Sequence, residues 1–476
     1  MGIARNASYN LIGNVAPLAV TIVTIPIYLK LIGLDRYGVL SLCWVMVGYF
    51  GLFELGLGPA TAQRIAPMEH RPPGERNEIV WAALMLSGIL GLIGGLVLWV
   101  AAQPALGSIK GLQSGLATEA RHALPWLALL LPISTCCGVL SGALQGRQQF
   151  LQLNLINGAG SVLLSLAPLA AAYFIRPELP VILPSLVLAR LATLAAMLVA
   201  CRSVVPLHRP PRPSVEIMRS LAIFGGWVTA AGILTPLLTS SEKFAIAWLA
   251  GASAVSIYMV PYNLVARLLL VPNSLASALY PQFATMAGDD VDDVEVKGLR
   301  SLVALMTPLV VLLAAILLPF FKLWLGDSIA HQSAPIGVIL LVGVWFNCCS
   351  YIPHARLQGR GRPDLVAKIS FFQVPLYFAA LYAAYRLGGV VGVAIVWSLR
   401  AAIEMLVFFT MTRQPRRLFG AAAIPAALVV AAAAITLSPG IPAIARLIGL
   451  LLLMTIALKF TMVEFGSRIM NLARQI

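Results

Sequence analysis

The stretch SLVALMTPLVVLLAAILLPFFK, residues 301–322, decides the class of fold. It carries no charge before its final lysine, and it reaches the length of about 20 residues that a helix needs to cross a membrane. Backbone N–H and C=O groups in lipid must be paired within a helix or a closed barrel. The run shows no alternation of apolar and polar residues, so it predicts a transmembrane α-helix and not a barrel strand.

Similar apolar runs recur along all 476 residues. Hydrophobic residues make up 60% of the chain and charged residues 11%, whereas about a quarter of the residues of a soluble domain are charged. The mean hydropathy is +0.90. We predict an all-α polytopic membrane protein with about fourteen transmembrane helices. The predicted spans are 9–31, 38–62, 79–102, 123–145, 154–175, 180–201, 219–249, 253–285, 301–322, 334–356, 365–385, 388–412, 420–437 and 443–462.

Charge in the loops predicts the orientation. The net charge of +15 comes from 33 lysines and arginines against 18 acids, and the basic residues are scattered between apolar runs, so no nucleic acid partner is expected. With the N-terminus in the cytoplasm, most loop lysines and arginines lie on the cytoplasmic side, as the positive-inside rule requires. An even number of spans then places both termini in the cytoplasm.

The chain shows no signature of catalysis, cofactor binding or metal binding. A phosphate-binding glycine loop, a nucleophile elbow and a histidine–carboxylate cluster are all missing from the sequence. Because the six cysteines lie in or beside apolar runs without metal-ligand spacing, we interpret them as small packing residues. They are Cys43, Cys136, Cys137, Cys201, Cys348 and Cys349. We therefore predict a protein that is not an enzyme and has neither cofactor nor metal.

A repeat predicts the domain organisation. Leu144-Gln145-Gly146-Arg147 ends the fourth predicted span and recurs as Leu357-Gln358-Gly359-Arg360 at the end of the tenth. The copies are six spans apart, so both halves have the same topology, as in transporters with two lobes related by a pseudo-two-fold axis along the membrane normal. We predict six-helix lobes around a central cavity at 1–202 and 219–412, a cytoplasmic linker at 203–218 and two additional helices in 413–476.

Polar residues recur on single faces of several predicted spans. Asn10 and Asn14 lie on such a face in the first span, Asn263 and Arg267 share one in the eighth, and His354 lies on one in the tenth. A single polar face is explained by hydrogen bonds between helices. Several of them, in both halves, favour a shared wet cavity.

Charged residues within the spans indicate what such a cavity binds. Arg190 and Arg267 have no acid one turn away on their own helix, whereas Arg400 can pair with Glu404 four residues later or contact a ligand. Mid-membrane charges are costly and mark function, and arginine matches phosphate oxygens with two parallel hydrogen bonds. The pattern predicts an anionic cargo.

Three further charged residues have open roles. Glu242 and Lys243 are adjacent, so we expect them to point in different directions and to have separate partners. Glu54 lies among glycines that allow close helix approach. It either carries a coupling proton or sodium ion or bonds to the asparagines of the first span. The acidic run GDDVDDVEVKG, residues 288–298, is expected to be a solvated cytoplasmic loop before a helix.

Four stretches resemble bacterial polysaccharide flippases of the O-antigen (Wzx) type, within the multidrug/oligosaccharidyl-lipid/polysaccharide exporter superfamily. The first two are RNASYNLIGNVAPLAVTIVTIPIYLKLIGLDRYGVLSL, residues 5–42, and GYFGLFELGLG, residues 48–58. GALQGRQQF, residues 142–150, resembles the end of that family's fourth helix. SSEKFAIAWLAGASAVSIYMVPYNLVARLLLVPNSLASALYPQF, residues 240–283, resembles its seventh and eighth helices.

The resemblance implies a flippase that carries an undecaprenyl-diphosphate-linked oligosaccharide to the periplasmic leaflet of the bacterial inner membrane by alternating access. It implies a cation-lined cavity, onto which Arg190, Lys243, Arg267 and Arg400 are placed by span position. Glu54 and Glu242 match acids common in the family, and with Glu404 they are candidates for ion coupling. Expected partners are the lipid-linked sugar, membrane lipids and the polysaccharide polymerase machinery.

Three alternatives stay open at this point. The first is an ion-coupled drug or metabolite antiporter of the same superfamily, and the second is a lipid II flippase. The third is a membrane glycosyltransferase or polymerase acting on the same lipids, for which the outer loop 103–122 offers too few polar residues.

Overall fold

Two compact units make up the chain: unit 1, Met1–Ser256, and unit 2, Ile257–Ile476. The computed structural model describes residues 2–53, 56–68, 73–107, 114–203, 205, 216–222, 234–285, 289–360 and 362–473. Within these ranges it describes the backbone alone at 2–18, 49–53, 73, 105, 107, 114, 234–237, 239, 278, 281, 284–285, 289, 363–364, 367 and 465–473. These residues form α-helices and one 3₁₀ turn, and no β-strand occurs among them. The predicted boundaries of the lobes, at 203–218, stay a prediction.

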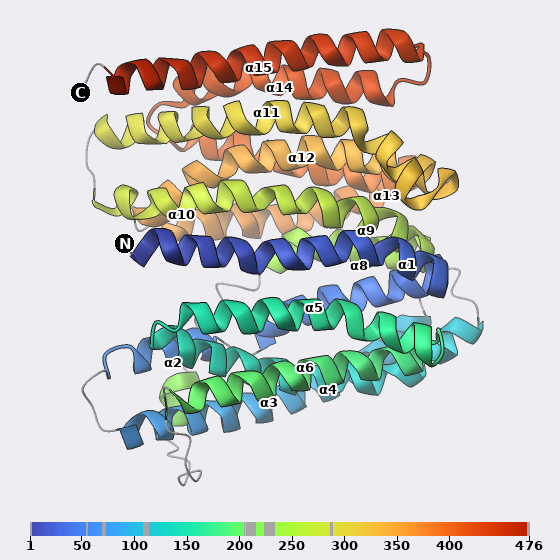
Figure 1. Cartoon of the computed structure of the whole chain (residues 1–476), viewed down its shortest axis with the longest axis vertical. Helices are drawn as coiled ribbons and strands as arrows, with labels where there is room; N and C mark the ends of the chain where they lie inside the picture. Colours follow the sequence, from blue (N-terminus) through green and yellow to red (C-terminus); the bar gives the residue numbers. More distant parts are fainter. Residues whose placement is uncertain are drawn as a thin grey trace. The chain divides into compact units, whose positions relative to one another are not determined.

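Unit 1 contains seven labelled helices, a short helical stretch at 216–222 and the first residues of α9 (Figure 1). The labelled elements are α1 (Gly2–Phe53), α2 (Leu57–Ile65), α3 (Pro73–Gly107), α4 (Ser114–Gly146), α5 (Phe150–Phe174), α6 (Leu179–Arg202), α8 (Leu234–Ala250) and the start of α9 (Ala252–Val265). The rest of α9 belongs to unit 2. It is followed by η1 (Ala266–Leu269), α10 (Leu270–Thr285), α11 (Asp289–Leu325), α12 (Asp327–Gly359), α13 (Pro363–Thr410), α14 (Pro415–Leu437) and α15 (Ala443–Ala473).

Eleven helices of the described part are long and apolar enough to cross a membrane. The sequence predicted about fourteen, and glycines explain most of the difference. α1 and α13 each contain two predicted spans, joined without a loop at Gly33 (φ 79°) and at Gly388–Gly389, where Gly389 has a φ of 58°. Such left-handed backbone is accessible to glycine at little cost. The predicted span 219–249 is described in part, through the 17-residue α8. The all-α polytopic fold is confirmed.

The outward surface is apolar. Leu323 and Leu387 are 92% and 90% exposed, and many other leucines, isoleucines and phenylalanines point away from the packed helices. A surface of this kind requires lipid as its solvent. The chain is therefore a multi-pass membrane protein.

Two aromatic side chains of α1 bind the backbone of α5. Pro168 has no N–H, so the carbonyl of Leu164, four residues earlier, lacks its usual helical donor. Trp44 Nε1 donates to that carbonyl at 3.2 Å, and the hydroxyl of buried Tyr28 donates to the carbonyl of Ser165 at 2.6 Å. The aromatic pair thus attaches α1 to α5 at a point where the helix of α5 is weakened.

We expect Tyr28→Phe to lower the free energy of unfolding by about 1 kcal/mol, the usual net contribution of one hydrogen bond. The ring and its packing are kept, so the loss reports the hydroxyl. Unfolding of the purified protein in micelles, followed by circular dichroism, measures it. Tyr173→Phe, at an exposed position on α5, is the control, and an equal loss in both variants would contradict the assignment.

The repeat seen in the sequence has a structural counterpart. α4 ends at Gly146 and α12 at Gly359, the glycines of the two Leu-Gln-Gly-Arg copies. In unit 1, α4 packs against α2, α3 and α6; in unit 2, α12 packs against α10, α11 and α13. Each copy of the tetrapeptide therefore lies at the end of a helix that packs against at least three other helices of its own unit.

Close approach of helices in unit 1 depends on glycine. A Cβ atom at Gly142 of α4 would lie 2.0 Å from the carbonyl oxygen of Gly58 in α2, and one at Gly95 of α3 would lie 2.6 Å from the carbonyl oxygen of Ala128. Small residues of this kind allow helix backbones to meet in membranes, where no hydrophobic force between helices is available. α4 is consequently fixed to both neighbours at van der Waals distance.

Candidate functional site

Glu242 and Lys243 form an ion pair on α8, within unit 1. Lys243 Nζ lies 2.9 Å from Glu242 Oε1 and donates a second hydrogen bond to Ser240 Oγ at 3.1 Å, and both charged side chains are buried. The expectation that these neighbours point apart is wrong, because the flexible lysine stem reaches the preceding carboxylate. The two charges neutralise each other, so the pair adds no net positive charge.

Arg190 has a neutral partner. On α6 it donates from Nε to the hydroxyl of Ser134 on α4, at 3.1 Å, and no described residue forms an ion pair with it. Arg190 thus lies at the middle of a membrane-spanning helix with a hydroxyl as its partner and no carboxylate among the described residues.

Arg400 and Glu404 lie on α13 in unit 2. Arg400 Nη1 is 3.1 Å from Glu404 Oε2, which confirms that these residues pair along the helix. The guanidinium also lies over the ring of Tyr377, 5.6 Å from its centroid, while its buried Nε has no acceptor in the part of the chain that the structure describes. The charge of Arg400 is thus largely compensated, but one of its donors is unsatisfied.

Asn263, Arg267 and His354 are the other predicted site residues of unit 2, and all are partly buried. Asn263 lies on α9 and Arg267 on η1. This turn has 3₁₀ geometry, in which the N–H of Leu270 donates to the carbonyl of Arg267, three residues earlier. Arg267 has no ion-pair partner among the described residues. His354 of α12 packs edge-on against Phe408, with ring centroids 5.7 Å apart.

Three predicted residues are not tested by the structure. Asn10 and Asn14 lie in α1, but their side chains are outside the described part of the chain, and Glu54 lies outside the described residues altogether. Their roles in binding and ion coupling stay predictions.

An apolar cavity of about 580 Å³ lies in unit 1 among α1, α3, α4, α6 and α8. Every residue that lines it is apolar, including Leu42, Leu127, Leu183, Phe244 and Trp248. It suits hydrocarbon and offers an anion no partner. The basic cavity predicted from the sequence is therefore not this one, and it stays a prediction.

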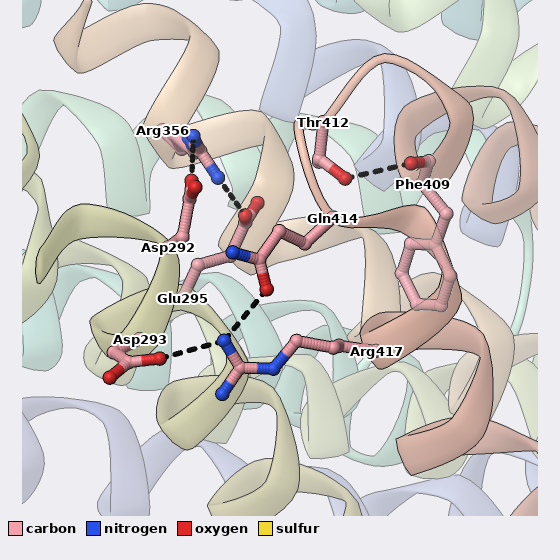
Figure 2. A network of polar contacts seen from close by, with 8 residues as sticks. All are labelled: Asp292, Asp293, Glu295, Arg356, Phe409, Thr412, Gln414 and Arg417. Atoms are coloured by element: carbon pink, nitrogen blue, oxygen red, sulfur yellow. Dashed lines mark hydrogen bonds and ion pairs between the residues drawn. The ribbon is translucent and has the colours of Figure 1, made fainter. Parts of the chain in front are cut away.

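The sequence analysis missed a buried charged cluster in unit 2, which we call the α11–α12 cluster: Asp292, Glu295 and Arg356. Arg356 of α12 donates to both carboxylates, one turn apart on α11 (Figure 2). The three residues are 1%, 1% and 4% exposed. The interpretation of residues 288–298 as a solvated loop is wrong, because α11 already begins at Asp289. The spacing of three between Asp292 and Glu295 was the available signal.

A second ion pair lies at the edge of this cluster. Arg417 Nη1, on α14, is 2.8 Å from Asp293 Oδ1 and 2.7 Å from Gln414 Oε1 (Figure 2). Its two charged side chains are 47% and 49% exposed. α11 thus carries one buried and one exposed ion-pair system within the same turns.

Unit 1 contains another ion pair that the sequence did not indicate. Glu119 Oε2 of α4 accepts from Arg36 Nε of α1 at 2.8 Å and from the backbone N–H of Leu179, the first residue of α6, at 3.3 Å. One carboxylate thus joins three helices of the unit.

Comparisons with known proteins agree with this architecture. The family described as "Polysaccharide biosynthesis protein" matches residues 3–287. A protein of Shigella flexneri named "Putative O-antigen transporter" is 23% identical over 409 residues, which cover 85% of this chain and 96% of that protein.

Two solved structures show the same fold. The lipid II flippase MurJ, in an inward closed conformation, has a TM-score of 0.73 at 12% identity, covering 97% of this chain and 99% of its own. A multidrug-resistance MATE transporter of the MOP superfamily, in its inward-facing conformation, has a TM-score of 0.64 at 17% identity, covering 87% and 99%.

Proposed function

This chain belongs to the polysaccharide biosynthesis protein family, and on that premise we propose that it is a flippase. Its cargo is an undecaprenyl-diphosphate-linked oligosaccharide, moved by alternating access from the cytoplasmic to the periplasmic leaflet of a bacterial inner membrane. The name of the Shigella flexneri relative supports this cargo. Both termini are cytoplasmic, the lobes are residues 1–202 and 219–412, and the polymerase machinery receives the product.

The observation that carries the proposal is the pair of uncompensated arginines. Arg190 has a hydroxyl partner, and Arg267 has no ion-pair partner among the described residues, although both lie in membrane-spanning segments. Uncompensated charge there is costly and is kept for function. A diphosphate supplies the missing negative charge, and the guanidinium plane matches its oxygens.

The other predicted binding residues are Lys243, Arg400, Asn10, Asn14, Asn263 and His354. The candidates for ion coupling are Glu54, Glu242 and Glu404.

We expect Arg190→Ala and Arg267→Ala each to abolish or strongly reduce transport while the protein still inserts. Loss of one charged hydrogen-bond donor to phosphate lowers affinity by about ten- to a hundredfold. The measurement is surface polysaccharide in a deletion strain complemented with each variant, together with the lipid-linked unit left on the cytoplasmic side.

Arg202→Ala is the matched control, since Arg202 ends the same helix as Arg190 and is exposed. Normal surface polysaccharide in both cavity variants would refute the role of the arginines. An unchanged glycan in the deletion strain itself, with new sensitivity to drugs, would favour an antiporter.

A further inference from the structure

The α11–α12 cluster holds two carboxylates against one guanidinium. Arg356 donates from Nη2 to Asp292 Oδ1 and from Nη1 to Glu295 Oε2. The other oxygen of Glu295, Oε1, is buried and accepts no hydrogen bond from any described residue. A buried carboxylate oxygen without a donor is costly, and so is a second buried negative charge that shares one cation.

Within the described part of the chain, Arg356 is the one cation that forms ion pairs with the cluster. α10, which packs against α11 and α12, contains no charged residue across 270–285. α15 contacts α11 near Ala304, where Thr461 Oγ1 donates to its carbonyl at 2.6 Å, and Lys459 and Glu464 lie around that contact, beyond the cluster. Arg360 of α12, one turn after Arg356, is a further cation that attracts the Glu295 carboxylate, but it is exposed and forms no ion pair with Glu295 among the described contacts. Asp290, Lys297 and Arg300 of α11 are exposed, and Arg417 of α14 pairs with Asp293.

We propose that the α11–α12 cluster is a proton-binding site, with the proton on Oε1 of Glu295. The proton adds to a carboxylate and gives a neutral carboxylic acid, so one negative charge is removed and the cluster becomes neutral. Oε2 of Glu295 and Oδ1 of Asp292 both still accept from Arg356. A proton needs no coordination shell, which suits an oxygen enclosed by the two helices.

The site also links protonation to the packing of α11 on α12. When the proton leaves, two negative carboxylates one turn apart share one guanidinium in a buried position, and their repulsion favours entry of water and separation of the helices. In a transporter, this makes the cluster the place where a proton gradient acts on conformation. That second statement rests on the proposed function; the proton site itself does not.

Infrared difference spectroscopy of the purified full-length protein, between acidic and alkaline buffer, tests the site directly. We expect the wild type to show the C=O stretch of a protonated, buried carboxylic acid, and Glu295→Gln to lose it. Asp293→Asn, which changes the exposed acid of the same helix, keeps the band. Loss of the band in Asp292→Asn, with retention in Glu295→Gln, overturns the assignment to Glu295.

Three further measurements complete the test. Glutamine is an isostere of the neutral acid, so Glu295→Gln is expected to elute as the folded wild type does, and its unfolding temperature to change less with pH; a pH dependence equal to that of the wild type contradicts the site. Replacement of potassium by sodium at constant pH should leave the band unchanged, and its disappearance would assign a metal cation instead. Transport by Glu295→Gln that no longer responds to a proton gradient supports coupling, whereas a retained response overturns coupling and leaves the infrared result intact.

Discussion

Arg356→Ala is expected to destabilise the protein by about 3–5 kcal/mol, the usual cost of removing one partner from a buried ion pair. The substitution removes the counter-charge of Asp292 and the hydrogen-bond donor of both Asp292 and Glu295, where both acids are about 1% exposed. Urea or detergent-induced unfolding of the purified protein, followed by circular dichroism, measures the loss. A low yield of inserted protein is the corresponding result in cells.

Arg417→Ala is the matched control for this prediction. Arg417 contacts an acid of the same helix but is 47% exposed, and exposed pairs contribute about 0–1 kcal/mol. Replacing both acids with neutral amides should rescue the defect, so Arg356→Ala is expected to cost much less when Asp292→Asn and Glu295→Gln are already present. Equal costs in both backgrounds would show that Arg356 acts through packing alone.

Gly142→Ala is expected to destabilise unit 1 by about 1–3 kcal/mol or to prevent its assembly, because overpacking forces neighbouring backbone to move. The added Cβ atom would lie 2.0 Å from the carbonyl oxygen of Gly58. That neighbour is backbone and cannot rotate away, so α2 must shift as a whole. Thermal unfolding of the purified variant and its yield from membranes are the measurements.

Gly115→Ala provides the opposite expectation on the same helix. Gly115 of α4 is exposed, and a Cβ atom there meets nothing within 4 Å. Alanine favours helix over glycine by up to about 1 kcal/mol, so this variant should be as stable as the wild type or slightly more stable. A loss in Gly115→Ala as large as in Gly142→Ala would mean that glycine matters there for some reason other than helix contact.

The sequence predicted the fold well because a membrane limits the choice of structure. The prediction used three features: the long apolar runs, the charges of the loops and the two Leu-Gln-Gly-Arg copies. Each is a property of a short stretch of sequence, and the contacts formed on folding do not change it. The joins at Gly33 and Gly389 were not predicted, because a glycine with positive φ can end a helix or connect two of them. Which of these it does depends on the packing of both segments.

The candidate site was predictable only in part. The pairing of Arg400 with Glu404 follows from helical spacing, and the structure confirms it. Asp292 and Glu295 looked like solvated acids because nothing in their own segment shows that Arg356, some sixty positions later, covers them. The neutral pair of Glu242 and Lys243 was missed for a related reason, since side-chain direction in a buried site is set by the surrounding helices.

The six cysteines of the protein are all unpaired thiols, and five are buried while Cys136 is partly exposed. Thiol-reactive dyes attack the thiolate, which is scarce in apolar surroundings. The folded protein should therefore stay nearly unlabelled and become brightly labelled as its helices separate. Dye labelling of the native cysteines therefore measures unfolding. A single cysteine added on a loop could be labelled selectively in the folded protein without removing the others.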